Sequence, residues 1–216
     1  MSLMRIIYLV RKDLIIEFRR SHEILSSLAF IIGASIIVSE ASYRLNMVEL
    51  TTPSLMVILV FLSIFNSTMT FIREVDRRTM YSLRLIPMPP VYLYYSKIIF
   101  SLIISSVEAL IVILSMALFT PGTNILNWRV IVSVLMLIIQ LSIVSSFVSA
   151  LVMYSEGRSF LIPMLIIIFI VPILPAIIVL SSPTHPTTII DYILIISSII
   201  ATLVSTSALS QYLLSV

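Results

Sequence analysis

Glu108 is the one carboxylate that lies deep inside an apolar run of this sequence. An ionisable side chain within a membrane is costly, and it is by default a candidate functional site. Glu108 either relays protons or stays protonated and bonds to a serine or to Gln140, which lies in the next apolar run. Two such polar groups are fewer than a proton-coupled carrier usually contains.

A second set of candidate functional residues lies between the second and third apolar runs. Its sequence is Arg73-Glu-Val-Asp-Arg-Arg-Thr-Met-Tyr-Ser-Leu-Arg-Leu-Ile-Pro-Met-Pro-Pro90. Its middle predicts a short helix with one apolar side, formed by Val75, Met80, Leu83 and Ile86. The prolines end this helix, because a residue that precedes proline is pushed towards extended geometry. A charged helix that ends in a rigid turn suits a mechanical contact with a cytosolic motor protein. It equally suits an interfacial helix that rests on lipid.

Catalytic constellations are absent from the sequence. It has no H-E-x-x-H motif, no Walker A loop and no G-x-G-x-x-G. The absence of cysteine excludes disulfides and thiolate metal sites, and two histidines, His22 and His185, are too few for a metal cluster. We therefore expect no enzyme activity, no metal and no cofactor on this chain. ATP-driven work would need a nucleotide bound by another subunit.

The composition excludes a water-soluble domain. Hydrophobic residues make up 60% of the chain and charged residues 11%, and the mean hydropathy is +1.18. Soluble domains are about 45–50% apolar and about 25% charged. Lipid must therefore be the solvent. Nucleic-acid binding is excluded because the basic residues flank apolar runs instead of forming a basic face with interleaved aromatics.

Six apolar runs are long enough to cross a bilayer, and each must be helical because backbone groups in lipid need internal hydrogen bonds. They are approximately Ile24–Ser39, Ser54–Ile72, Lys97–Phe119, Val130–Tyr154, Phe160–Ser181 and Ile189–Leu213. An alternative limit of the first run is Tyr43, which places Glu40 at the interface. The sequence thus predicts an all-α membrane protein with one transmembrane domain over residues 1–216. The first 23 residues lack the order of a cleavable signal peptide, so we expect the first span to direct insertion.

The distribution of basic residues predicts the orientation. The N-terminal segment, the second connection and the fourth connection together carry eleven of the 13 Lys and Arg residues, and only Arg44 and Arg129 fall on the other side. Basic residues are in excess on the cytoplasmic side of membrane proteins. We therefore expect both termini in the cytoplasm and the chain in the cell membrane.

Residues 1–23 predict a cytoplasmic amphipathic helix that lies along the interface. Its apolar positions are Leu3, Ile6, Ile7, Val10, Leu14 and Phe18. Its charged positions, mostly elsewhere on the helix, include Arg5, Arg11, Lys12, Asp13, Glu17, Arg19 and Arg20. The helix is either a plain anchor before the first span or an elbow that contacts a peripheral partner.

Small residues and prolines predict how the spans pack. Ser142, Ser146 and Ala150 repeat every four residues, as do Ser197, Ala201 and Ser205. Such stripes allow close helix contacts, so we expect packing faces and, as the lesser alternative, a homodimer. The fifth span contains Pro163, Pro172 and Pro175. Prolines in mid-membrane predict a broken or kinked helix at Pro172 and Pro175, either static or a hinge.

At residues 73–96 the sequence resembles the permease subunits of ABC exporters. The most similar are the CcmB-type subunits of the haem exporter of cytochrome c maturation. In that family, acidic residues precede Gly-Ser-Leu-Glu and a Leu-rich run that ends in Ser-Pro-Leu-Pro. Here Glu74 and Asp76 match the acids, Thr79 matches the serine, and Pro87-Met-Pro89 matches Pro-Leu-Pro.

Two further stretches are similar to the same family. The segment Arg11-Lys-Asp-Leu-Ile-Ile-Glu-Phe-Arg-Arg20 resembles its charged opening helix, and Val171-Pro-Ile-Leu-Pro175 resembles a stretch of its fifth span. The sequence departs from the motif at Arg78, where the family has glycine, and at Tyr81, where it has glutamate. Chain length, span number and orientation also agree with the family.

The resemblance implies a permease that takes part in haem export or delivery, driven by a cytosolic ATPase subunit of the CcmA type. It implies a CcmC-type haem-handling neighbour and places the ATPase contacts on the elbow and on residues 73–96. That coupling surface would comprise Glu74, Asp76, Arg77, Arg78, Thr79, Pro87 and Pro89. An axial haem ligand at His185 is the lesser alternative to an ordinary loop histidine. The competing functions are export of a lipid, glycan or drug, a proton-coupled carrier that uses Glu108, and a scaffold.

Overall fold

The computed structural model describes residues 2–19, 21–45, 50–85, 89–120, 125–181 and 189–215, and these contain helices but no strand. The helices are α1 (Ser2–Phe18), α2 (Ser21–Arg44), α3 (Thr51–Ser67), the π-helix η2 (Thr68–Ile72), α4 (Arg73–Asp76), α5 (Met80–Arg84), α6 (Pro90–Phe119), α7 (Trp128–Val152), α8 (Arg158–Ile170), α9 (Leu174–Ser181) and α10 (Ile189–Ser215). The all-α prediction is confirmed. Five helical segments in the described part of the chain are long and apolar enough to cross a membrane, and the number is six if the bent pair α8–α9 counts as one span.

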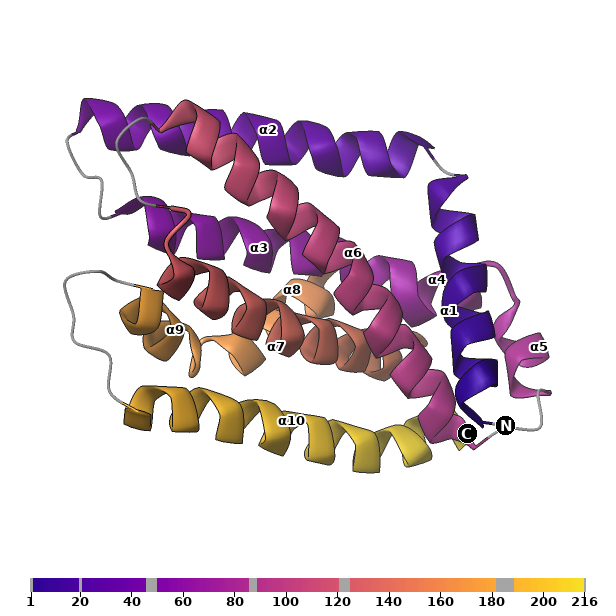
Figure 1. The fold of residues 1–216 in the computed structure, drawn as a ribbon. Helices are drawn as coiled ribbons and strands as arrows, with labels where there is room; N and C mark the ends of the chain where they lie inside the picture. The colour runs from indigo at the N-terminus through magenta and orange to yellow at the C-terminus, as the bar shows by residue number, and fades with distance from the viewer. Residues whose placement is uncertain are drawn as a thin grey trace.

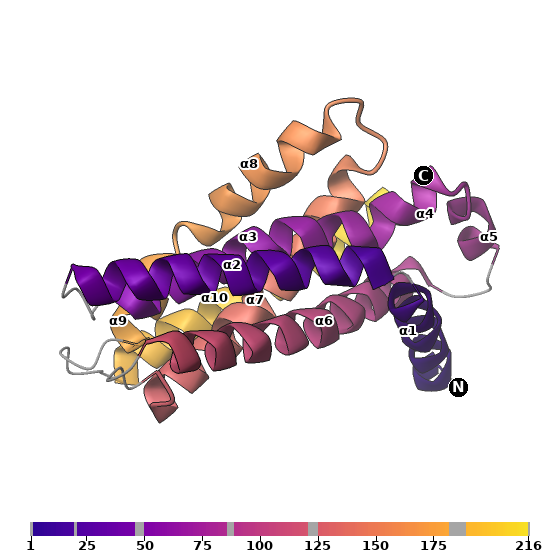
Figure 2. The same ribbon diagram turned by 90° about the horizontal axis from the view of Figure 1, so that it is seen from above.

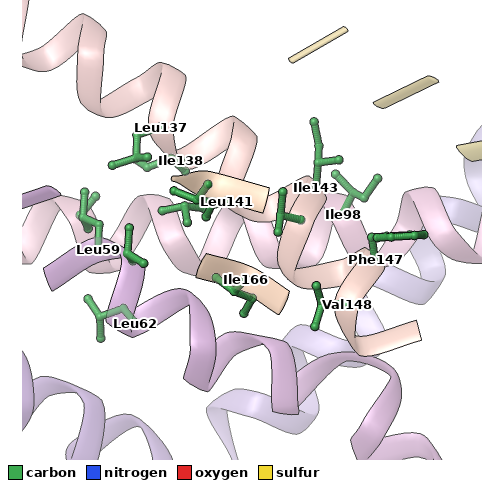
Figure 3. Packing of buried hydrophobic residues seen from close by; sticks show 14 of the residues in the cluster. Leu59, Leu62, Ile98, Leu137, Ile138, Leu141, Ile143, Phe147, Val148 and Ile166 are labelled. Atoms are coloured by element: carbon green, nitrogen blue, oxygen red, sulfur yellow. The ribbon is translucent and has the colours of Figure 1, made fainter. Parts of the chain in front are cut away.

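Helix α7 forms the centre of the bundle (Figure 1). In its most apolar stretch 72% of the residues are buried, against 17% in α2 and 11% in α10. Figure 3 shows how α7 residues such as Leu141, Phe147 and Val148 pack with Leu62 of α3 and Ile166 of α8. A helix that is apolar on all sides must be buried in protein or lipid. Protein surrounds α7, whereas the outer helices present their apolar side chains to the lipid.

Several helices extend beyond the apolar runs that predict them. Helix α2 continues to Arg44, whose Nε lies 2.6 Å from Glu40 Oε1 one turn earlier. Helix α6 begins at Pro90 instead of Lys97, and proline suits a first helical position because its missing N–H has no partner there. Hydropathy detects only the part of a helix that lies in hydrocarbon, whereas the hydrogen bonding continues into the interface.

The fifth span is broken between α8 and α9, which are bent by 59° relative to each other. Pro172 lies within the break at residues 171–173, and Pro175 occupies the second position of α9. Pro163 lies inside α8 without ending it.

The two ends of the chain lie at the same end of the bundle (Figures 1 and 2). Helix α1 runs crosswise to the long helices there, and α4 and α5 lie beside it. This arrangement gathers the elbow helix, the segment after the second span and the start of the third span in one place. Arg20, Pro87 and His185 lie outside the described residues.

Candidate coupling site

Helix α1 turns two acidic side chains inward. Val10, Asp13 and Glu17 are buried against the bundle, whereas the apolar Ile7 and Phe18 are exposed. The side of α1 that packs on the bundle therefore carries two of the charges of the helix, whereas apolar residues such as Ile7 and Phe18 point away from the bundle. The acids are accommodated because cations from other helices meet them, which the sequence of α1 alone does not reveal.

Lys97 of α6 lies between two carboxylates, that of Asp13 on α1 and that of Glu74 on α4. Its Nζ is 2.8 Å from Asp13 Oδ2 and 3.3 Å from Glu74 Oε1, and its side chain is 4% exposed. Lys12 Nζ reaches Glu74 Oε1 at 2.9 Å and Asp13 Oδ1 at 3.3 Å. Thr79 Oγ1 donates a hydrogen bond to the other Glu74 oxygen. Glu74 thus joins the elbow helix α1 to the third span through two lysines.

A second buried pair lies next to this group. Arg73 Nη1 is 2.6 Å from Glu17 Oε2, and the Glu17 side chain is only 2% exposed. We call the set Lys12, Asp13, Glu17, Arg73, Glu74 and Lys97 the ion cluster. Its three acids and three bases carry no net charge, which is how charges are tolerated in a buried position.

Lys12 is the most exposed member of the ion cluster. Burial lowers the pKa of its ammonium group, but the carboxylates of Asp13 and Glu74 raise it more, so the net pKa lies above the ordinary value of 10.5. Lys12 therefore stays charged at physiological pH and keeps the cluster neutral.

The rest of the predicted coupling surface lies outside the ion cluster. Asp76, Arg77, Arg78, Thr79 and Pro89 are exposed, whereas Glu74 is buried. Helix α5 sits on the bundle through Met80 and Leu83, which are buried as the apolar pattern predicts. The exposed part of the predicted coupling surface is therefore smaller than the sequence suggests, because Glu74 is buried in the ion cluster.

The turn between α4 and α5 has two notable residues. Asp76 Oδ1 lies 2.6 Å from Arg158 Nη2 at the start of α8, which ties the turn to the fifth span. Arg78 has a φ of 58°, a left-handed conformation that glycine adopts most readily. The remaining elbow residues Arg11 and Arg19 are exposed on α1.

The π-helix η2 connects the second span to the ion cluster. Thr70 has non-helical dihedral angles (φ −88°, ψ −108°), which interrupts the regular hydrogen bonding. Ser149 Oγ of α7 accepts hydrogen bonds from the backbone N–H groups of Phe71 at 3.0 Å and Ile72 at 3.3 Å. A serine of the central helix therefore replaces backbone acceptors that the break removes.

The two polar residues predicted within the membrane do not contact each other. Glu108 Oε2 accepts a hydrogen bond of 2.7 Å from Asn66 Nδ2, and the same nitrogen lies 3.1 Å from Ser105 Oγ. Gln140 Oε1 instead accepts one of 3.1 Å from Thr202 Oγ1 of α10. The sequence held one signal for the pairing of Asn66 with Glu108, because Asn66 is an isolated amide within the second apolar run. A hydropathy profile averages over such a single polar residue.

The predicted packing stripes have different positions. Ser142, Ser146 and Ala150 of α7 are buried, in agreement with the prediction. The stripe of α10, which contains Ser197, Ala201 and Ser205, is exposed, so it is not a packing face within this chain. Helix α10 packs through another face, which includes Ile195, Thr206 and Ser210.

His22 lies exposed near the start of α2. Among the residues that the structure describes, no group of three or more His, Cys, Asp or Glu side chains could hold a metal ion. The acids and bases of the ion cluster bind one another and so join α1, α4 and α6 at this end of the bundle.

Comparison with known proteins places this architecture in a family. No curated protein matches the chain. The family described as ABC-2 type transporter matches residues 4–174, which include the elbow helix, the ion cluster and the first half of the bent fifth span. ABC-2 membrane domains are transporter components that work with an ATPase partner in the lipid bilayer, and they are not themselves catalytic. This chain belongs to the ABC-2 type transporter family and is the multi-pass membrane subunit of an ABC transporter.

Proposed function

We propose that this chain is the permease subunit of an ABC exporter in which a cytosolic ATPase of the CcmA type drives haem delivery for cytochrome c maturation. The carrying observation is the ion cluster, which connects α4, the helix that leads into the turn before α5, to α1 and α6. ATP would be bound by the ATPase, and haem would be handled by a CcmC-type neighbour, with no cofactor held by this chain.

The geometry supports force transmission through this turn. A push on the exposed turn acts directly on α4, which continues the second span through η2. Glu74 of α4 is bound to Lys97 at the start of the third span, and Arg73 is bound to Glu17 of the elbow. Buried ion pairs resist separation because an unpaired buried charge is costly. A displacement of the turn is therefore shared among α1, the second span and the third span.

The haem assignment is supported by the motif at residues 74–89. Arg78 adopts the left-handed conformation at the position where the CcmB-type motif has glycine. A glycine at this position would form the same turn without a Cβ penalty. This agreement between the family's residue and the local backbone supports the alignment of the motif.

The orientation belongs to the same proposal. Eleven of the 13 basic residues belong to the N-terminal segment and to the second and fourth connections, and the described ones lie at the end of the bundle that bears α1, α4 and α5. Because basic residues are in excess on the cytoplasmic side, that end would face the cytoplasm of a chain in the cell membrane. Both termini then lie on the side where an ATPase binds ATP.

Co-purification tests the partner. We expect the tagged chain, extracted in a mild detergent, to bring down an ATPase subunit, and ATP hydrolysis by this complex to depend on the turn. Asp76→Arg should reduce the ATPase stimulation at least fivefold. Arg158→Asp breaks the same ion pair from the other side, and the double exchange Asp76→Arg with Arg158→Asp restores that pair.

The three variants separate two roles of Asp76. If the ATPase stimulation stays low in the double exchange, Asp76 contacts the ATPase itself. If the stimulation recovers, Asp76 acts only through its ion pair with Arg158. An unchanged rate in Asp76→Arg, or the absence of an ATPase under gentle extraction, would overturn the coupling proposal.

Haem delivery has its own test. We expect deletion of the encoding gene to abolish covalent haem in c-type cytochromes, as seen by haem staining of gels, and the wild-type chain to restore it. The matched family is described only as ABC-2 type transporter, so a lipid, glycan or drug exporter is the second candidate. Normal haem staining in the deletion strain would favour that candidate.

A further inference from the structure

A groove lies on the other side of α4 from the elbow helix. Its volume is about 700 Å³, within the range of small-molecule sites. It is lined by parts of α2, α3, η2, α4 and α8. Figure 2 shows α8 diverging from α3 towards the end of the bundle that bears α4, and the groove lies where they separate.

One side of the groove is basic. Arg73, Arg77 and Arg158 line it, and Asp76 is the only acid among its lining residues. Arg73 is paired with Glu17 and Arg158 with Asp76. Arg77 makes no ion pair within the described part of the chain, so it contributes an uncompensated positive charge. The guanidinium group of Arg158 keeps further N–H donors, since it has five and its ion pair with Asp76 uses one nitrogen.

The other side of the groove is apolar. Ile64, Phe65, Ile72 and Ile162 provide aliphatic and aromatic surface next to the arginines. Hydroxyl groups of Ser26, Thr68 and Ser159 line the space between these surfaces. An apolar wall with a few converging polar groups is the usual composition of a ligand site. Guanidinium groups select carboxylates or phosphates among the possible head groups.

We propose that this groove binds an anionic amphiphile, with its carboxylate or phosphate on Arg77 and its apolar body against Phe65 and Ile162. The inference rests on the proposed transport function, because it names the class of substrate that the permease takes. Haem, with its carboxylate side chains, and an anionic phospholipid share this chemistry. The groove meets the coupling turn at Asp76 and Arg77, so a bound ligand lies next to the segment that the ATPase moves.

A binding experiment on the purified full-length chain without its ATPase tests this site. Hemin is titrated by absorbance, and fluorescent phosphatidylglycerol is compared with phosphatidylcholine carrying the same label. We expect Arg77→Gln to weaken binding of hemin, of phosphatidylglycerol or of both about tenfold, and Arg77→Lys to retain most of it. Arg78→Gln is the matched control, since Arg78 is the exposed neighbouring arginine outside the groove.

The outcomes divide clearly. An Arg77-dependent loss for hemin assigns the site to haem, and a loss only for phosphatidylglycerol assigns it to a lipid. Equal losses in Arg77→Gln and Arg78→Gln, no loss in either, or equal binding of phosphatidylcholine would overturn the inference. A change in the dimer fraction of Arg77→Gln without a change in ligand binding would assign the groove to a second copy and also overturn it. None of these results alters the ATPase experiment, so failure of the site is distinct from failure of the coupling proposal.

Discussion

Lys97 shows how a single side chain changes the role of residues far away in the sequence. It is nearly enclosed, and it binds Asp13, which is 84 positions earlier, and Glu74, which is 23 positions earlier. Its ammonium group also lies 5.9 Å from the centre of the Phe71 ring. Without Lys97, the partly exposed Lys12 would be the single cation left to balance the two buried carboxylates of Asp13 and Glu74. The stability of this end of the molecule therefore depends on Lys97.

Replacement of Lys97 by methionine should destabilise the chain by about 3 kcal/mol, because it removes one partner of a buried ion pair and leaves the carboxylates. We expect the midpoint of thermal unfolding in detergent to fall by roughly 5–10 °C. Arg11→Met, on the exposed face of α1, is the matched control and should change the midpoint little. Equal midpoints for Lys97→Met and wild type would show that the cluster is not stabilising.

Glu108 is held by an amide and not by a chain of titratable groups. Its contact is Asn66 Nδ2 at 2.7 Å, and a glutamine carbonyl at this position accepts the same hydrogen bond. We therefore expect Glu108→Gln to keep ATP-driven transport within about twofold of wild type. Glu108→Leu, which leaves Asn66 with fewer acceptors, should lower stability by about 1–3 kcal/mol. Loss of transport in a folded Glu108→Gln variant would revive the proton-coupled alternative.

At the scale of elements, the connection between the second span and the coupling turn is not a continuous α-helix. The break at Thr70 leaves the N–H groups of Phe71 and Ile72 to Ser149 of α7. Because the acceptor belongs to another helix, these two hydrogen bonds can break and re-form without unwinding of η2 itself. The second span therefore has a junction between the part packed in the membrane and the part that carries Arg73 and Glu74.

Two serines of α7 provide a matched pair that measures this junction. Both Ser146 and Ser149 are completely buried, but Ser146 Oγ has no hydrogen-bond partner in the part of the chain that the structure describes, whereas Ser149 Oγ accepts two hydrogen bonds. Ser149→Ala should lower the free energy of unfolding by about 1–3 kcal/mol because it leaves buried N–H groups unpaired. Ser146→Ala should be nearly neutral. Equal effects in chemical denaturation would show that η2 does not depend on Ser149.

At the scale of the whole molecule, the ionic connections are concentrated at the end of the bundle that bears both termini. Elsewhere the described spans are joined by apolar packing and by single hydrogen bonds between helices, such as Ser115 Oγ to Ser35 Oγ at 2.8 Å and Ser101 Oγ to Ser145 Oγ at 3.0 Å. Under the proposed function, force applied at the turn would enter the ion-paired end and pass into spans held mainly by apolar contacts. Such contacts allow small sliding movements more readily than ion pairs do.

The absence of cysteine makes the orientation directly measurable. Single cysteines at Arg78 and Glu156 should be protected from a membrane-impermeant maleimide in intact cells and labelled in inverted vesicles. Cysteines at Leu45 and Leu126, at the opposite end, should show the reverse pattern, and all four positions are exposed. Labelling of position 78 in intact cells would reverse the proposed topology and with it the ATPase contact.

The amino-acid sequence by itself determined the helical class and the approximate limits of the candidate spans. It could do so because hydropathy is a local property and because a backbone in lipid must satisfy its hydrogen bonds within each segment. The break in the fifth span also lies where its prolines occur, since proline removes a local hydrogen bond. The resemblance at residues 73–96 indicated the transporter class that the family match then established.

Only the tertiary structure decided what the charged residues do. Asp13 and Glu17 read as solvated positions of an interfacial helix, and Glu74 reads as part of an exposed loop. Their partners Lys97 and Arg73 come from other helices, and Arg73 is 56 positions from Glu17. Ion pairing in the interior depends on which helices meet, and helix periodicity carries no information about that. The sequence therefore located the membrane domain, and the packing of α1, α4 and α6 brought its charged residues together in the ion cluster.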